Sequence, residues 1–175
     1  MRKQTNIILR IKEGFIHPLF FALLISLPCI SQDSNSYFQD LFNFNHQKLN
    51  HNLKYASQED QIFYKNIIVF LNVLFNETSI SENLINHYEK SIENLENLNF
   101  KNPKLKHYYI GEAQLILSLI HVKFGNQISS AKFFIKAYGS FKKNIKTYPE
   151  LKDPEVPMRF MEVSASILPK SLQWI

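Results

Sequence analysis

The chain has 175 residues, with 20 Lys and Arg, 15 Asp and Glu, one Cys and four Gly. This length corresponds to one domain, and a hydrophobic share of 45% is enough to form a core, which excludes a fully disordered chain. One Cys excludes an internal disulfide and a Cys-rich zinc site, and the spacing of the four Gly excludes a glycine-rich phosphate loop.

Residues 1–31 have the pattern of a secretory signal peptide. An apolar stretch at 18–27 follows a basic start, and Pro28 ends that stretch. Cys29 and Ser31 then place small residues at the −3 and −1 positions of a cleavage site, so we expect cleavage after about Ser31. The basic residues of the start are Arg2, Lys3, Arg10 and Lys12.

The net charge of the chain is lower when this leader is left out. The whole chain carries +5, but the residues after position 31 carry only +2. A nearly neutral domain does not favour a nucleic-acid partner, and we expect none. We expect an exported protein of the periplasm or outer envelope. An uncleaved anchor, a buried N-terminal helix and a lipidated Cys29 remain alternatives, and membrane contact is expected only through the leader or Cys29.

Apolar residues recur at helical spacing through most of residues 32–175, which predicts an all-α domain. A first helix is expected at 37–53. A helix over about 58–75 follows an N-cap at Ser57, and the next helix, reaching Leu98, begins at a capping box formed by Ser79 and Glu82.

Three further helices are expected at about 105–124, 129–147 and 154–168. Gly125 suits the end of the first of these, because glycine adopts the left-handed conformation without strain. Asp153 and Pro154 suit the start of the last, as a cap and a first-turn proline. The domain therefore consists of hairpins at about 58–98 and 105–147 with a flanking helix on each side.

The two hairpins repeat each other at an offset of 46 residues. This offset aligns Tyr88 with Phe134 in the second helices, and Phe63 with Tyr109 in the first helices. Such self-similarity predicts two supersecondary units of the same kind.

The second hairpin resembles the tetratricopeptide-repeat (TPR) family. Its small, glycine and aromatic positions are filled in order by Ser118, Gly125, Ser130, Phe134 and Ala137, while the first hairpin keeps Leu84, Tyr88 and Ser91. The resemblance implies antiparallel helical hairpins stacked as a short α-solenoid. The period of 46 residues is longer than that of the family, and Gln114 and His121 stand where aromatic residues are usual.

Residues 109–174 are also similar to large exported bacterial helical-repeat proteins that continue beyond such a segment. A truncated fragment without independent function is therefore one alternative. A small helical ligand-binding protein or enzyme is another. The third hypothesis, which we favour, is a non-catalytic module that binds a protein or peptide, with no cofactor, metal or catalytic set.

The TPR-like arrangement predicts a concave groove lined by first helices. The side chains expected on it are Tyr64, Asn72, Tyr108, Glu112, Gln114 and Lys123.

Two charged strips also stand out. The third predicted helix carries Glu82, Glu89, Glu93 and Glu96, and the fifth carries Lys132, Lys136, Lys142, Lys143 and Lys146. Both are interpreted chiefly as solvated faces. The alternatives are binding of a cation or a basic peptide to the acidic strip, and of phosphate or an acidic peptide to the basic strip. His121 is expected to be half-buried with its hydrogen bonds satisfied.

Overall fold

The computed structural model describes residues 35–43, 45–75 and 82–167, and within these residues it is helical with no strand. The predicted all-α class is therefore confirmed for this part of the chain. Residues 1–31, the capping residue Ser79 and the C-terminal Trp174 lie outside the described residues. The helices are α2 (Asn35–Phe42), α3 (His46–Leu53), α4 (Gln58–Phe75), α5 (Glu82–Asn97), the 3-10 turn η3 (Pro103–Leu105), α6 (Lys106–Lys123), α7 (Gln127–Thr147) and α8 (Glu155–Ile167).

The single helix predicted at 37–53 is wrong, because the chain forms two helices, α2 and α3. The Asn45 side chain accepts a hydrogen bond from the Lys48 amide at 3.3 Å and so begins a new helix. Asp40 on α2 then accepts hydrogen bonds from Lys48 Nζ at 2.8 Å and Asn52 Nδ2 at 3.1 Å. These side-chain bonds hold α3 against α2 and compete with a continuous helix.

The helix ends predicted from caps agree closely with the structure. Ser57 Oγ accepts from the Asp60 amide at 3.2 Å, at the start of α4. Gly125 has φ 77°, the left-handed conformation expected after α6, and the Asn126 side chain then caps α7 by accepting from the Ser129 amide. Helix α8 begins at Glu155, directly after Asp153 and Pro154.

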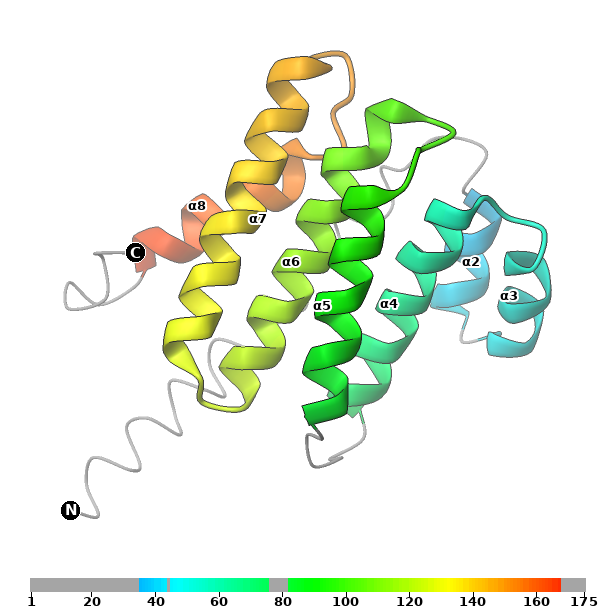
Figure 1. The fold of residues 1–175 in the computed structure, drawn as a ribbon, viewed down its shortest axis with the longest axis horizontal. Coiled ribbons are helices and arrows are strands. Elements are labelled where there is room, and N and C mark those ends of the chain that lie inside the picture. The colour runs from blue at the N-terminus through cyan, green and yellow to red at the C-terminus, as the bar shows by residue number, and fades with distance from the viewer. Residues whose placement is uncertain (1–34, 44, 76–81, 168–175) are drawn as a thin grey trace.

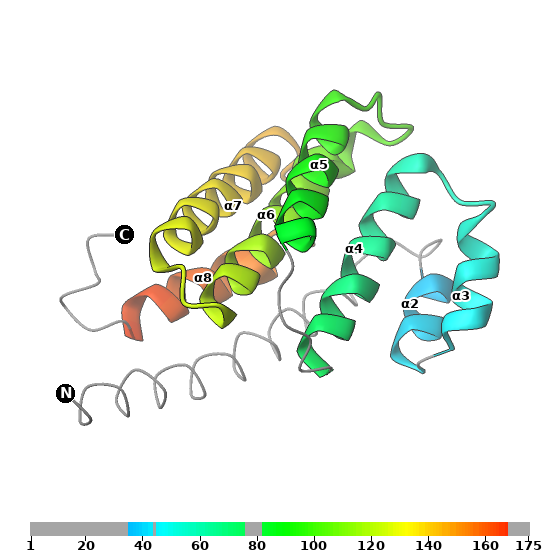
Figure 2. The same ribbon diagram turned by 60° about the horizontal axis from the view of Figure 1, so that its bottom comes forward.

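Helix α6 lies at the centre of the molecule, between α5 and α7 (Figure 1). Every residue from Tyr108 to His121 is buried, so α6 is enclosed on all sides rather than on one face. Helices α4 and α5 run in opposite directions, and so do α6 and α7; Figure 2 shows the same order from another side. The core therefore forms around α6.

Small residues allow α6 and α7 to approach each other closely. A Cβ atom on Gly111 would lie 2.6 Å from the Phe141 ring, which is itself fully buried. Farther along, Ser118 Oγ donates to the Ser130 carbonyl at 2.9 Å, and Ala137 is fully buried. Three of the predicted repeat-packing residues, Ser118, Ser130 and Ala137, therefore lie in the core, while Phe134 is half-buried.

The α4–α5 pair is joined by a buried polar contact. The Tyr88 hydroxyl donates to the Asn66 carbonyl at 2.6 Å, and the Asn66 amide donates to Ser91 Oγ at 2.7 Å. Both predicted packing residues of this hairpin, Tyr88 and Ser91, are thus buried.

The two hairpins meet through aromatic residues. The rings of Phe63 on α4 and Tyr109 on α6 stack with centroids 4.1 Å apart, and the Tyr109 hydroxyl donates to Asp60 at 2.7 Å. Phe63 and Tyr109 are the residues that the 46-residue offset aligns.

Among the described helices, none has both the length and the apolar character needed to cross a bilayer.

The close approach at Gly111 leads to a stability prediction. Gly111→Ala should destabilise the fold by about 1–3 kcal/mol, because the added methyl group overlaps the fully buried Phe141 ring, which must shift within the core. Gly139→Ala is the matched control, since nothing lies within 4 Å of its Cβ position. That variant should gain about 0.5–1 kcal/mol from better helix propensity. Urea unfolding followed by circular dichroism measures both, and a Gly111→Ala variant as stable as Gly139→Ala would contradict the packing.

Candidate functional site

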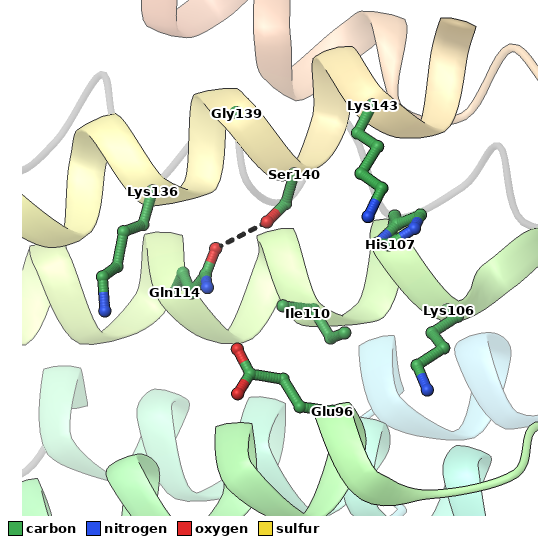
Figure 3. Close-up of a pocket in the computed structure, with 9 residues that line it drawn as sticks. All are labelled: Glu96, Lys106, His107, Ile110, Gln114, Lys136, Gly139, Ser140 and Lys143. Carbon is green, nitrogen blue, oxygen red and sulfur yellow. Dashed lines mark hydrogen bonds between the residues drawn. The ribbon is translucent and has the colours of Figure 1, made fainter. Parts of the chain in front are cut away.

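A groove of about 540 Å³ lies over α6, between α5 and α7 (Figure 3). We call it the α5–α7 groove. Most of its lining residues have polar or charged side chains, and its cations come from two helices. The lining residues are Glu96, Lys106, His107, Ile110, Gln114, Lys136, Gly139, Ser140 and Lys143.

The floor of the groove is fixed by one hydrogen bond between helices. Ser140 Oγ on α7 donates to Gln114 Oε1 on α6 at 2.8 Å. This bond orients the Gln114 amide, whose nitrogen points away from Ser140 in Figure 3. Ile110 adds an apolar surface one turn earlier on α6, and Gly139 leaves open space at the α7 edge.

Two of the groove's lysines are exposed and a third is held by the protein. Lys136 and Lys143 project from α7 and are exposed. Lys106 is half-buried, and its Nζ donates to the Leu98 carbonyl at 3.1 Å. Positive charge is therefore concentrated on the α7 side, where a bound carboxylate would find Lys136 and Lys143.

His107 contributes a neutral ring to the groove at neutral pH. Partial burial lowers the pKa of His107 below its usual value of 6.5, and the nearby cations Lys143 and Lys106 lower it further. Figure 3 shows Lys143 pointing toward this ring. The imidazole is therefore available as a hydrogen-bonding group, and an anion bound between the lysines would favour its protonation.

The structure corrects the predicted groove residues. Tyr64 on α4 is buried in the interior, and so are Tyr108 and Glu112 on the enclosed helix α6, so these three do not line an open surface. Of the six, Gln114 alone lines the α5–α7 groove.

The last two predicted groove residues lie away from this site. Asn72 is exposed on α4, and Lys123 at the end of α6 donates to the Val73 carbonyl. The groove in the structure is thus bordered by the second helices of the hairpins, whereas the sequence analysis placed it on the first helices.

Tyr108 and Glu112 form a buried polar pair on α6. Neither the Tyr108 hydroxyl nor either carboxyl oxygen of Glu112 has a hydrogen-bond partner among the described residues. Burial raises the pKa of Glu112 to about 8, and the nearby Tyr108 hydroxyl offsets part of that effect. Glu112 is therefore protonated at neutral pH in the folded protein.

His121 differs from its prediction. It is buried and stacks on Phe133, with ring centroids 5.6 Å apart, but neither ring nitrogen has a hydrogen-bond partner among the described residues. Burial lowers its pKa, and the charge of Glu89 on α5 raises it in part. The expected half-burial is therefore wrong, and no described residue supplies the hydrogen bonds that were expected for its ring.

Sequence reasoning found part of this site. The predicted basic strip contains Lys136 and Lys143, and the predicted acidic strip contains Glu96. It missed Lys106, His107 and Ser140, whose placement depends on how α5 and α7 pack against α6.

Within the described residues, no group of three or more His, Cys, Asp or Glu is arranged to hold a metal ion. Comparison with protein-family models, curated proteins and solved structures finds no match.

The buried carboxyl leads to a pH prediction. The pKa of Glu112 is about 8 when folded and near 4.5 when unfolded, so between these values only the folded state holds the proton. This contribution to the free energy of unfolding is complete below pH 4.5 and falls by about 1.4 kcal/mol per pH unit up to pH 8. Glu112→Gln should remove that fall.

The measurement is urea unfolding of the wild type and Glu112→Gln at several pH values from 5 to 8.5, a window set by that pKa of about 8. The difference in stability should grow with pH in favour of the variant. Glu93→Gln is the control for losing one carboxyl group, since Glu93 is exposed on α5. A constant difference across the range would show that Glu112 is ionised in the fold.

Proposed function

We propose that the chain is a non-catalytic interaction module of the bacterial cell envelope that binds a protein or peptide segment in the α5–α7 groove. The observation that carries the proposal is the groove itself, which is open and has two exposed lysines above a hydrogen-bonded polar floor. Rigid helices on both sides position these groups, as a binding surface requires.

The TPR-like solenoid belongs to the same proposal. It is supported by the 46-residue offset and by the buried small residues Ser118, Ser130 and Ala137 between α6 and α7. The stack of Phe63 on Tyr109 adds a contact between equivalent positions of neighbouring hairpins. In such arrays the grooves between stacked helices are the usual binding surfaces for peptides and partner helices.

A selection experiment tests the binding function. A random peptide library is displayed and selected on the full chain, and enriched peptides are measured by isothermal titration. The double variant Lys136→Glu, Lys143→Glu should bind them at least about tenfold more weakly, because it reverses both exposed cations of the groove.

The matched control is Lys142→Glu, Lys146→Glu. It makes the same change of charge on exposed positions of α7 that do not line the groove, and it should bind as the wild type does. Equal binding to all three proteins, or a selection that enriches nothing, would contradict the groove function.

Export is tested separately. When the full chain is produced in a bacterial host with a C-terminal tag, N-terminal sequencing of the envelope fraction should give a chain that begins at Gln32. Leu24→Arg places a charge in the apolar stretch and should block export. A chain in the envelope that keeps Met1, or one that begins with a lipidated Cys29, would contradict cleavage after Ser31.

A further inference from the structure

The α5 side of the groove carries a row of carboxylates. Glu96 lines the groove, and in Figure 3 its carboxylate points toward α6. Glu93 and Glu89 precede it by three and seven residues, so they share its helical face, and all three are exposed. The charge of Glu89 acts on His121, which lies near the C-terminal end of α6. Glu89 therefore lies beside the C-terminal end of α6. We call these three residues the acidic row.

The α7 side carries a row of lysines. Lys136 and Lys143 line the groove, and Lys132 lies one turn before Lys136. The Nζ atoms of Lys132 and Lys136 lie 5.7 and 5.5 Å from the centre of the Phe133 ring, which stacks on His121. The basic row, Lys132, Lys136 and Lys143, therefore borders the same stretch of α6 as the acidic row, from the opposite side.

The two rows run in the same direction (Figure 1), and each contains two residues that lie seven positions apart. Helices α5 and α7 run the same way (Figure 1), and seven residues separate Glu89 from Glu96 and Lys136 from Lys143. Seven residues of helix span about 10.5 Å. Within the described part of the chain, no residue of either row forms an ion pair, so α6 keeps two sets of opposite charge apart.

We propose that the occupant of the α5–α7 groove is a partner helix with acidic residues along one edge and basic residues along the other. This inference rests on the proposed function and names the chemistry of its partner. The acidic edge would face Lys136 and Lys143, and the basic edge would face Glu89, Glu93 and Glu96. A helix repeats the same edge every seven residues, which is the separation of Glu89 from Glu96 and of Lys136 from Lys143.

Charge complementarity selects this partner over simpler ones. A segment with acidic residues on both edges would meet repulsion from the acidic row, and a basic segment would meet repulsion from the basic row. A nucleic acid would place phosphates against the carboxylates of α5. Only a partner with both signs, separated across its width, is attracted by both walls.

Three helical peptides of about 20 residues test this proposal. They share one apolar face and differ only at the two edges: one peptide is acidic on one edge and basic on the other, one is acidic on both, and one is basic on both. Fluorescence anisotropy measures their binding to the full chain. The two-signed peptide should bind at least about tenfold more tightly than either of the others.

Charge reversal should change the preference in a defined way. Lys136→Glu, Lys143→Glu leaves both walls acidic at the groove, so the basic peptide should bind best. Glu93→Lys, Glu96→Lys makes both walls basic, so the acidic peptide should bind best. Lys142→Glu, Lys146→Glu changes the same amount of charge outside the groove and should keep the wild-type ranking.

The outcomes separate the two proposals. If the acidic peptide binds the wild type as tightly as the two-signed peptide, the groove binds a partner but the two-edged helix is wrong. The same holds if the reversed variants keep the wild-type preference. If none of the three peptides binds the wild type while peptides selected from the library do, the inference fails and the groove function stands; if neither kind binds, both fail.

Discussion

The enclosure of α6 is the constraint on which the rest of the structure depends. A helix buried on every side needs neighbours that approach it closely, and Gly111 allows this by leaving room for the Phe141 ring of α7. The Ser118–Ser130 hydrogen bond continues the contact toward the other end of the pair. Because α6 is the innermost helix, α5 and α7 stand on either side of it, and the space above it becomes a groove.

The same enclosure explains the unusual polar groups of α6. Once the helix is surrounded, Glu112 and His121 lose water without gaining hydrogen-bond partners among the described residues, so burial favours their neutral forms. An uncharged Glu112 is less costly to bury than a carboxylate, but it still opposes stability as the pH rises. Such a residue in a central helix is tolerated because the surrounding aromatic and aliphatic packing supplies the net stability.

Local signals were enough to predict most helix boundaries. Ser57 and Gly125 act only on residues close to them in the sequence. The ends of the helices next to them lie within two residues of the predicted ends. The break between α2 and α3 was missed because Asn45 and Asp40 reach across the turn, which apolar spacing does not record. The groove was placed on the wrong helices because polar residues such as Glu112 were assumed to face water. The burial of Glu112 follows from the enclosure of α6 by the neighbouring helices, which no local pattern contains.

The stability of the fold does not explain the charged residues that border the groove. The ion pairs of the described residues are mainly local or exposed, such as Lys152 with Glu155 and Arg159 with Glu162, and pairs of this kind contribute little. Among the residues that the structure describes, Glu93, Glu96, Lys136 and Lys143 form no such pairs, although α5 and α7 lie on two sides of one helix (Figure 1). Joining those charges directly would have closed the space over Gln114 and Ser140. Keeping them apart leaves an open floor with opposite charges on its two margins, and the proposed partner helix would pair with both.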